Sequence, residues 1–473
     1  MLQYIAVGVA TFAVYKAYNI FKCPDELKQL YAAPLLSFIF FTLDMGCYRD
    51  KIDRYYQPYL NKHGIIRVLT PVGWCLYVGN ARLCKEIASQ ADIYHRFNLL
   101  LIAPVNLRRF LGKSHVGFHN GEEWKKHRKI INPIFNQTWS TKLFGTSIQN
   151  LIDELEKMAG KDVKFYHVIN SKNPNSKIYN LYDSIFKQLF GQPVYLLFPF
   201  MEYVPFFRRT KLSHQLDEYH EFIQEMIALR MDELKKGTLV ENRDLVSALV
   251  KSNDNSSETK LTMEEIRENL SVFISTGHDT VTNTLTSTLY YLARYPDVQE
   301  KLRAQVLSAL GDPSPSKVQI PTIEQLKNIP LLDMVIKESM RIMTTVPAIP
   351  KKSTIISTLS NGLTIPAKTA VFLHYWVVHH NPNDFPDPYE FKPERFADIS
   401  NEATKNWQSF GTGPRKCIAN TFALMETRVT ISMLLQKFEF CISEDNPNYH
   451  KLNIASNFLL YPKDLSLEIK IRT

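Results

Sequence analysis

Apolar and polar residues alternate with helical spacing over most of the chain. From about Gly121 onward, long segments place apolar residues three and four positions apart, which is typical of amphipathic helices. The clearest patterns predict helices over residues 262–294, 323–343 and 420–438. Residues 68–78 and 362–372 are instead rich in β-formers around turn-forming prolines and glycines, so we expect a hairpin in the first segment and a strand in the second. A large helical part with a small β part predicts an α+β fold that is mainly α-helical.

The N-terminus carries an apolar run without charged side chains, residues 4–15. No positive residue precedes this run, whereas Lys16 and Lys22 follow it, so the positive-inside rule favours a membrane anchor with the rest of the chain in the cytosol. The run is short for a bilayer span, and a cleaved signal peptide is the alternative. We expect a membrane anchor in residues 1–22, a linker in residues 23–46 and one large domain in residues 47–473.

Charge and cysteine content narrow the classes of partner. Lys and Arg number 56 and Asp and Glu number 47, giving a net charge of +9, which suits an anionic membrane surface or an acidic protein partner. This excess is too small and too dispersed to indicate a nucleic-acid-binding protein. The six cysteines form no Cys-x-x-Cys pair, which argues against a zinc site and favours reduced thiols.

The most informative stretch surrounds a single thiol, Cys417. Gly411 and Gly413 let the backbone turn tightly and approach a flat ligand closely, and Arg415 can pair with a carboxylate. Because a helix is predicted from Asn420, the thiol lies just before a helix N-terminus, where the helix dipole favours a thiolate. A buried structural cysteine is the alternative for the thiol alone.

This stretch resembles the haem-binding loop of the cytochrome P450 monooxygenases, Phe-x-x-Gly-x-Arg-x-Cys-x-Gly. Phe410, Gly413, Arg415 and Cys417 match the pattern, whereas Ala419 replaces its last glycine. The resemblance implies haem b as cofactor, with Cys417 as the axial thiolate ligand of the iron. It also implies that Phe410 and Arg415 belong to the cofactor site.

A second constellation lies inside the helix predicted over residues 262–294. Gly277 weakens this helix, and Thr280 can donate a hydrogen bond to a carbonyl one turn earlier. An acid beside a hydroxyl at such a point suits proton delivery to dioxygen. The segment resembles the family motif Ala/Gly-Gly-x-Asp-Thr-Thr, in which Asp279 and Thr280 match the acid and the alcohol and are the expected catalytic residues. Thr276 and Val281 depart from the motif.

Three further residues resemble groups that hold the haem propionates. Trp124 and Arg128 match the family's Trp-x-x-x-Arg motif and lie one helical turn apart on one face. Lys351 stands where the family usually has an arginine, which weakens that expected contact. An ordinary basic helix is the alternative for the first pair, and Lys125, Lys126 and Lys129 are candidates for docking an acidic reductase.

The family also buries a Glu-Arg-Arg network that supports the cysteine loop, and Glu338, Arg341 and Arg395 match it. A buried carboxylate shared by two guanidiniums requires complete pairing, so we assign this network a structural role. By the same resemblance, residues 97–116, 344–351 and 457–460 line an apolar substrate pocket. Residues 194–207, rich in Phe, Tyr, Leu and Pro, are expected either to enter the membrane or to be core.

Together these features predict a cytochrome P450 that inserts one atom of dioxygen into a small lipophilic substrate. Since no flavin or nicotinamide motif is present, electrons are expected from a separate NADPH-cytochrome reductase. The expected location is the endoplasmic reticulum membrane, with the catalytic domain facing the cytosol. The alternatives are a haem-thiolate isomerase or dehydratase, and a non-catalytic haem-binding protein.

Overall fold

The computed structural model describes residues 21–98, 103–164, 177–192, 194–195, 198–238, 244–253, 260–311, 317–456 and 459–472. Nearly all of the anchor predicted for residues 1–22 therefore lies outside the described residues. Among the residues that are described, no helix is both long and apolar enough to cross a bilayer.

The described residues fall into two compact units. The first contains the chain up to Phe97, together with Val346–Glu390 and Glu402–Lys416. The second contains Asn98–Thr345, Phe391–Asn401 and the chain from Cys417 onward. The chain therefore passes from one unit to the other at the peptide bond between Lys416 and Cys417.

A five-stranded sheet organises the first unit, in the order β1-β2-β8-β5-β3. Its strands alternate outward and inward side chains, and the inward ones form a core with the helix that follows β2. Only β2 and β8 pair in parallel within this sheet, with Cys75 opposite Ala370. The elements are η1 (Asp25–Leu27), α2 (Ser37–Leu43), α3 (Tyr48–Tyr55), α4 (Gln57–His63), β1 (Ile65–Thr70), β2 (Gly73–Val78), α5 (Ala81–Ser89), β3 (Tyr94–Arg96), β5 (Ile349–Ser353), β6 (Ser357–Thr358), β7 (Thr364–Ile365), β8 (Ala370–Leu373), α18 (Tyr375–His379) and α19 (Glu402–Asn406).

The first predicted β segment is confirmed in this unit and the second in part. The hairpin expected over residues 68–78 is the antiparallel pair β1 and β2, which turns at Gly73 with a positive φ of 98°. In place of the single strand expected over residues 362–372, the structure has two short strands, β7 and β8, which belong to different sheets.

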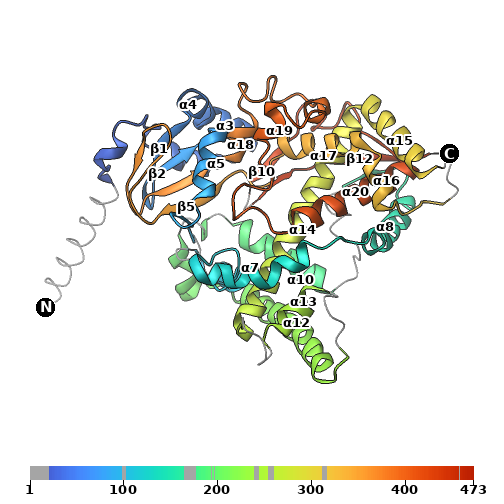
Figure 1. Ribbon diagram of the computed structural model, residues 1–473, viewed down its shortest axis with the longest axis horizontal. Coiled ribbons are helices and arrows are strands. Elements are labelled where there is room, and N and C mark those ends of the chain that lie inside the picture. The colour runs from blue at the N-terminus through green and yellow to red at the C-terminus, as the bar shows by residue number, and fades with distance from the viewer. Residues whose placement is uncertain are drawn as a thin grey trace. The chain divides into compact units, whose positions relative to one another are not determined.

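Helices dominate the second unit (Figure 1). Its elements are α6 (Val105–Leu111), α7 (Gly121–Phe135), α8 (Thr141–Glu156), β4 (Asp162–Val163), α10 (Lys177–Phe190), η3 (Pro199–Tyr203), η4 (Pro205–Phe207), α12 (Thr210–Lys235), α13 (Leu245–Lys251), α14 (Met263–Arg294), α15 (Pro296–Leu310), α16 (Ile323–Lys327), α17 (Pro330–Ile342), η5 (Pro393–Phe396), α20 (Asn420–Lys437), β9 (Phe438–Cys441), β10 (Ile454–Ser456), β11 (Leu460–Pro462) and β12 (Leu467–Ile471). The strands form the small sheets β4-β12-β9 and β10-β11.

Helix α14 is the central helix of the second unit, and it contacts α6, α12, α13, α15, α17 and α20. It begins with a capping box, in which the Thr262 hydroxyl accepts from the Glu265 N–H and the Glu265 carboxylate accepts from the Thr262 N–H. This element confirms the helix predicted over residues 262–294, and α20 confirms the one predicted over residues 420–438.

The single helix predicted over residues 323–343 is wrong, because the structure has two helices there, α16 and α17. Pro330 is the first residue of α17. Proline has no N–H to donate and disfavours a helical conformation in the residue before it, so the first helix ends ahead of Ile329.

Candidate cofactor and catalytic site

Cys417 lies three residues before α20, whose N-cap is Ala419. Burial raises the pKa of the Cys417 thiol, while a hydrogen bond from the Ala419 backbone and the positive charge of Arg128 lower it. The residue as a whole keeps surface that is exposed to solvent, although protein atoms surround the thiol closely enough to raise its pKa. A thiol with a helix N-terminus and a guanidinium nearby is a suitable metal ligand, since a bound cation favours the thiolate.

Trp124 and Arg128 lie together on α7, as their spacing predicted. The Arg128 guanidinium carbon lies 5.6 Å from the centroid of the Trp124 ring, and Nη1 donates to Oδ1 of Asn132 at 3.3 Å. Burial lowers the pKa of Arg128, whereas Cys417 raises it. The guanidinium therefore lies close enough to the thiol for each to influence the charge of the other.

The turn before the cysteine belongs to the first unit and depends on its glycines. Gly411 and Gly413 have φ values of 71° and 72°, which residues other than glycine rarely adopt. A Cβ on Gly413 would lie 2.5 Å from the carbonyl oxygen of Ala88, so the backbone also needs glycine for space. In the same turn, the ring of Phe410 packs edge-on against Trp407.

Four basic groups gather in the first unit near this turn: His95, Arg96, Lys351 and Arg415. Arg96 of β3 lies opposite Lys351 of β5, which is only 2% exposed. Burial and the positive charges of Arg96 and Arg415 lower the pKa of Lys351 to about 7. Burial and Arg415 also lower the pKa of His95. Such a concentration of positive charge favours an anionic ligand, because carboxylates would relieve the repulsion.

His95 and Arg96 were not predicted from the sequence. They lie on a three-residue strand, which is too short to give a periodic signal. Their place beside Lys351 depends on strand pairing across more than half of the chain.

The middle of α14 carries the predicted acid and alcohol. Asp279 is 3% exposed, and the hydroxyl of Tyr182 on α10 donates to its Oδ2 at 2.7 Å. The other oxygen, Oδ1, lies 3.2 Å from Nδ1 of His278. The Thr280 hydroxyl donates to the Thr276 carbonyl at 2.8 Å, which confirms the bond predicted one turn back. Tyr182 was not singled out in the sequence, since an aromatic residue on an amphipathic helix gives no sign of a polar partner.

Helix α14 stays α-helical through this region and does not bulge. Thr276 and Gly277 are nevertheless exposed in the middle of an otherwise largely buried helix. A Cβ on Gly277 would meet no atom within 4 Å. The helix thus presents an open face beside its buried acid.

The Glu-Arg-Arg network is present as predicted. Glu338 is fully buried, and it accepts hydrogen bonds from Arg341 Nε at 2.7 Å and from Arg395 Nε at 3.2 Å. The Lys392 N–H also donates to Glu338 Oε1 at 3.0 Å. The carboxylate is therefore well paired, as burial of a charge requires.

Comparison with known proteins decides the family. The family model described as Cytochrome P450 matches residues 76–469. The chain belongs to the cytochrome P450 family. Its fold is the P450 fold, and it is a P450 monooxygenase, an oxidoreductase. The cofactor of this family is haem b held by an axial cysteine thiolate.

Individual relatives have low sequence identity to the chain but align with most of its length. The chain is 28% identical to mouse Cytochrome P450 3A16 over 380 residues, which is 72% of each chain. It is 27% identical to human Cytochrome P450 4X1, covering 83% of this chain and 80% of that one. Among solved structures, the crystal structure of the cytochrome P450DA heme domain matches with a TM-score of 0.75 at 18% identity, covering 94% of this chain and 98% of that one.

Each unit contains residues whose chemistry suits a haem. In the second unit, Cys417 has a thiol of the kind that ligates haem iron. In the first unit, the basic groups around Lys351 suit carboxylates.

Proposed function

We propose that this P450 inserts one atom of dioxygen into a lipophilic substrate, using electrons from a separate NADPH-cytochrome reductase. The observation that carries the proposal is the buried Asp279 carboxylate, bonded to Tyr182 and adjacent to the Thr280 hydroxyl on the open face of α14. Overall, the substrate, dioxygen, NADPH and one proton give the hydroxylated product, water and NADP⁺.

The cofactor would be held by residues from several elements. Cys417 is the proposed axial ligand, and Phe410 is the proposed packing partner beside it. Trp124, Arg128, Lys351 and Arg415 are the proposed partners of the two propionates, because each offers a hydrogen-bond donor. When bound, haem supplies the redox chemistry that cleaves the O–O bond.

The side chains of α14 handle protons. Asp279 Oδ2 accepts from Tyr182, which leaves Oδ1 for exchange with His278, a residue whose side chain is 30% exposed. Thr280 Oγ1 donates to the Thr276 carbonyl, so its lone pairs remain to accept a hydrogen bond from a water molecule. The proposed role of Asp279 is to resupply this position with protons, and that of Thr280 is to orient the water.

A lipophilic substrate and a membrane location are supported by exposed apolar surface. Residues 194–207 were expected to be either core or membrane-facing, and within this segment Phe200, Tyr203 and Phe206 are 63%, 62% and 88% exposed. Leu36, Phe40 and other residues of the segment around α2 are exposed as well. Apolar surfaces of this kind mark contacts with membranes or partners. We therefore propose the endoplasmic reticulum membrane as the location, with the catalytic domain in the cytosol and residues 1–22 as the anchor.

The docking role of the basic residues of α7 needs one correction. Lys126 is bonded to Glu265 and Glu123, so it is engaged within its own unit and is unsuited to holding a reductase.

Two measurements test the proposed function. The reduced protein with carbon monoxide is expected to give the far-red-shifted Soret band of thiolate-ligated haem, and Cys417→Ala is expected to lose it. Cys441→Ala, which removes a half-buried cysteine on β9, is the matched control and should keep the band. NADPH oxidation with the reductase and a lipophilic substrate should then yield a hydroxylated product.

The same assays separate the alternatives. Turnover of a hydroperoxide without any reductase would indicate the isomerase or dehydratase. The shifted band without turnover under either condition would indicate a non-catalytic haem-binding protein. The Asp279–Thr280 pair favours the monooxygenase, because only that reaction consumes protons supplied by the solvent.

A further inference from the structure

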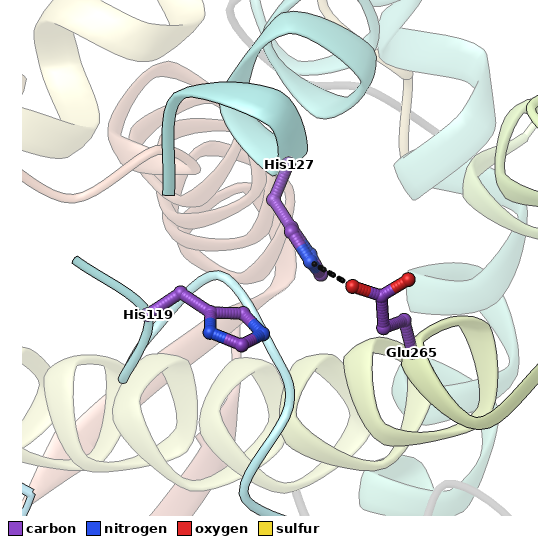
Figure 2. A group of neighbouring side chains, drawn as sticks. All are labelled: His119, His127 and Glu265. Carbon is purple, nitrogen blue, oxygen red and sulfur yellow. Dashed lines mark hydrogen bonds and ion pairs between the residues drawn. The ribbon is translucent and has the colours of Figure 1, made fainter. Parts of the chain in front are cut away.

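Two histidines and a glutamate converge in the second unit (Figure 2). His119 lies on the segment between α6 and α7, His127 lies on α7, and Glu265 lies in the first turn of α14. One donor atom from each residue lies within 4.8 Å of the other two. The rings of His119 and His127 have their centroids 4.8 Å apart.

We propose that His119, His127 and Glu265 form a binding site for a divalent transition-metal ion of the zinc class. Two imidazoles and one carboxylate are a ligand set that zinc uses in proteins, with a fourth position for water. The lack of Cys-x-x-Cys pairs argued against a zinc site, but this pattern bears only on sites built from cysteines. No spacing rule could find this cluster, because one of its ligands lies in a different part of the sequence from the other two.

The distances suit a shared ion. Nε2 of His127 lies 3.2 Å from Oε1 of Glu265. Two donors that are each about 2.1 Å from a tetrahedral ion are about 3.4 Å apart, so this pair is already near chelating separation. His127 is fully buried, whereas His119 is half-buried on a connecting segment. The His119 donor lies within 4.8 Å of the other two donors, so His119 has to move closer to them to complete the site.

The charge states also suit a metal. Burial lowers the pKa of both His119 and His127, which keeps the imidazoles neutral. Burial raises the pKa of Glu265, but hydrogen bonds from Lys126, from the Thr262 backbone and from His127 lower it to about 2. At neutral pH the two imidazoles are therefore neutral and the carboxylate is ionised, which are the charge states that a bound cation requires.

Lys126 occupies the place of the cation at Glu265. Its ammonium lies 2.8 Å from Oε1 of Glu265 and 2.8 Å from Oε2 of Glu123. A divalent ion would compete with this ammonium for Glu265, and Lys126 would keep its second partner, Glu123. The Lys126 ammonium therefore competes with a divalent ion for Glu265 and lowers the affinity of the site for that ion.

Asn269 sets a second condition on binding. Its Oδ1 accepts from the Val116 N–H at 3.1 Å, and its Nδ2 donates to the Glu265 carbonyl at 2.6 Å and to Nδ1 of His127 at 2.9 Å. The His127 proton therefore lies on Nε2, facing Glu265. Coordination through Nε2 moves the proton to Nδ1, so the Asn269 amide must turn its oxygen toward that ring.

The test uses the full haem-containing chain and zinc chloride. Equilibrium dialysis followed by elemental analysis should find one zinc per chain besides the haem iron, and zinc-edge X-ray absorption should show imidazole scattering. His119→Ala should weaken binding at least tenfold, whereas His214→Ala, which removes an exposed histidine of α12, should leave it unchanged. Zinc retained equally by His119→Ala, or absent from the wild-type chain, would overturn the proposal.

A second pair of variants tests the competitor. Lys126→Gln should bind zinc about tenfold more tightly, because an opposing charge is removed. Lys125→Gln is the matched control, since it removes an ammonium of the same helix that pairs with Glu122. Equal affinity in Lys126→Gln and the wild type would contradict the assignment of Glu265 as a ligand. The carbon monoxide spectrum and the melting temperature without zinc establish that each variant is folded.

Discussion

A single hydroxyl group decides how the Asp279 carboxylate is held. Tyr182 donates to Oδ2 at 2.7 Å, and both side chains are buried. Hydrogen bonds to a charged group contribute more than neutral ones, about 1.5–3 kcal/mol. The phenol therefore fixes the orientation of the carboxylate.

We expect Tyr182→Phe to lower the yield of product per NADPH and to increase the release of hydrogen peroxide. Without its partner, Asp279 is less well oriented for proton delivery. Hydrogen peroxide and product are measured together in the reconstituted system. Tyr219→Phe, which alters a buried phenol of α12, is the control and should keep the wild-type ratio. An unchanged ratio in Tyr182→Phe would show that the phenol has no part in proton supply.

The buried Lys351 leads to a prediction about how the free energy of unfolding depends on pH. Its pKa is lowered to about 7 in the folded chain, against about 10.4 in an unfolded chain. Between these pH values the unfolded state binds a proton that the folded state has lost, so the free energy of unfolding rises with pH. Below about pH 7 both states bind this proton, so Lys351 causes no change of the free energy of unfolding with pH. In the haem-free chain, Lys351→Met should remove the rise, measured by urea unfolding at a series of pH values.

A control variant and the addition of haem show whether Lys351 causes this rise with pH. Lys352→Met changes the next residue of β5, whose ammonium lies over the Phe97 ring, and should keep the rise. Haem should reduce the rise in the wild type, since a propionate beside Lys351 would raise its pKa. A rise of the same size in Lys351→Met would mean that other groups cause it.

At this scale the sequence predicts residues that belong to motifs and misses their partners. Asp279 and Thr280 were found because the order Asp-Thr follows a glycine in a helix. Tyr182 and Arg96 were not, because their roles come from tertiary contacts between segments far apart in sequence. The His119, His127 and Glu265 cluster was missed for the same reason.

Among the elements, the long helices were predictable because burial of one face imposes a period on the sequence. Helix α14 extends over 32 residues, so its pattern outweighs local exceptions such as Gly277. The break between α16 and α17 was missed although Pro330 marks it, because apolar spacing continues across the break. A single residue can end a helix, whereas apolar periodicity is measured over many residues and so does not locate helix ends.

The turn before Cys417 provides a prediction about backbone geometry. Gly413 and Gly311 both have a φ of 72°, but only Gly413 has a neighbouring backbone atom where a Cβ would lie. Gly311→Ala should cost about 1–2 kcal/mol in free energy of unfolding, from its left-handed conformation alone. Gly413→Ala should cost more and should also reduce haem content, because the turn must move away from Ala88. Urea unfolding and haem absorbance measure both effects, and equal costs would mean that the contact with Ala88 is easily relieved.

Over the whole molecule, the two units contain different chemical groups. The first contains a sheet, a glycine turn and clustered basic groups, and the second contains the Cys417 thiol and the long helix with its acid. The α+β class followed from composition and pattern. The division into units did not, because each is assembled from separate parts of the chain.

Membrane association is testable at this scale. A chain lacking residues 1–22 should still bind vesicles of anionic lipid, because loss of Lys16 and Lys22 lowers the net charge only from +9 to +7 and residues 198–207 expose aromatic side chains. Phe200→Ser with Phe206→Ser should weaken binding more than tenfold, since each buried phenylalanine contributes about 1.5–3 kcal/mol. Vesicle sedimentation measures this. Ile399→Ser, at a residue 82% exposed, is the control and should have no effect.

The parallel pairing of β2 with β8 has a consequence for biosynthesis. Cys75 pairs with Ala370, so the ribosome must make the intervening chain before β2 has its second neighbour. At about 5–20 residues per second this takes on the order of tens of seconds. Meanwhile β2, whose residues are mostly buried in the finished sheet, exposes an unpaired apolar edge that can pair with other chains. The yield of folded protein in a cell will therefore depend on the chaperones that cover this strand until its partner emerges.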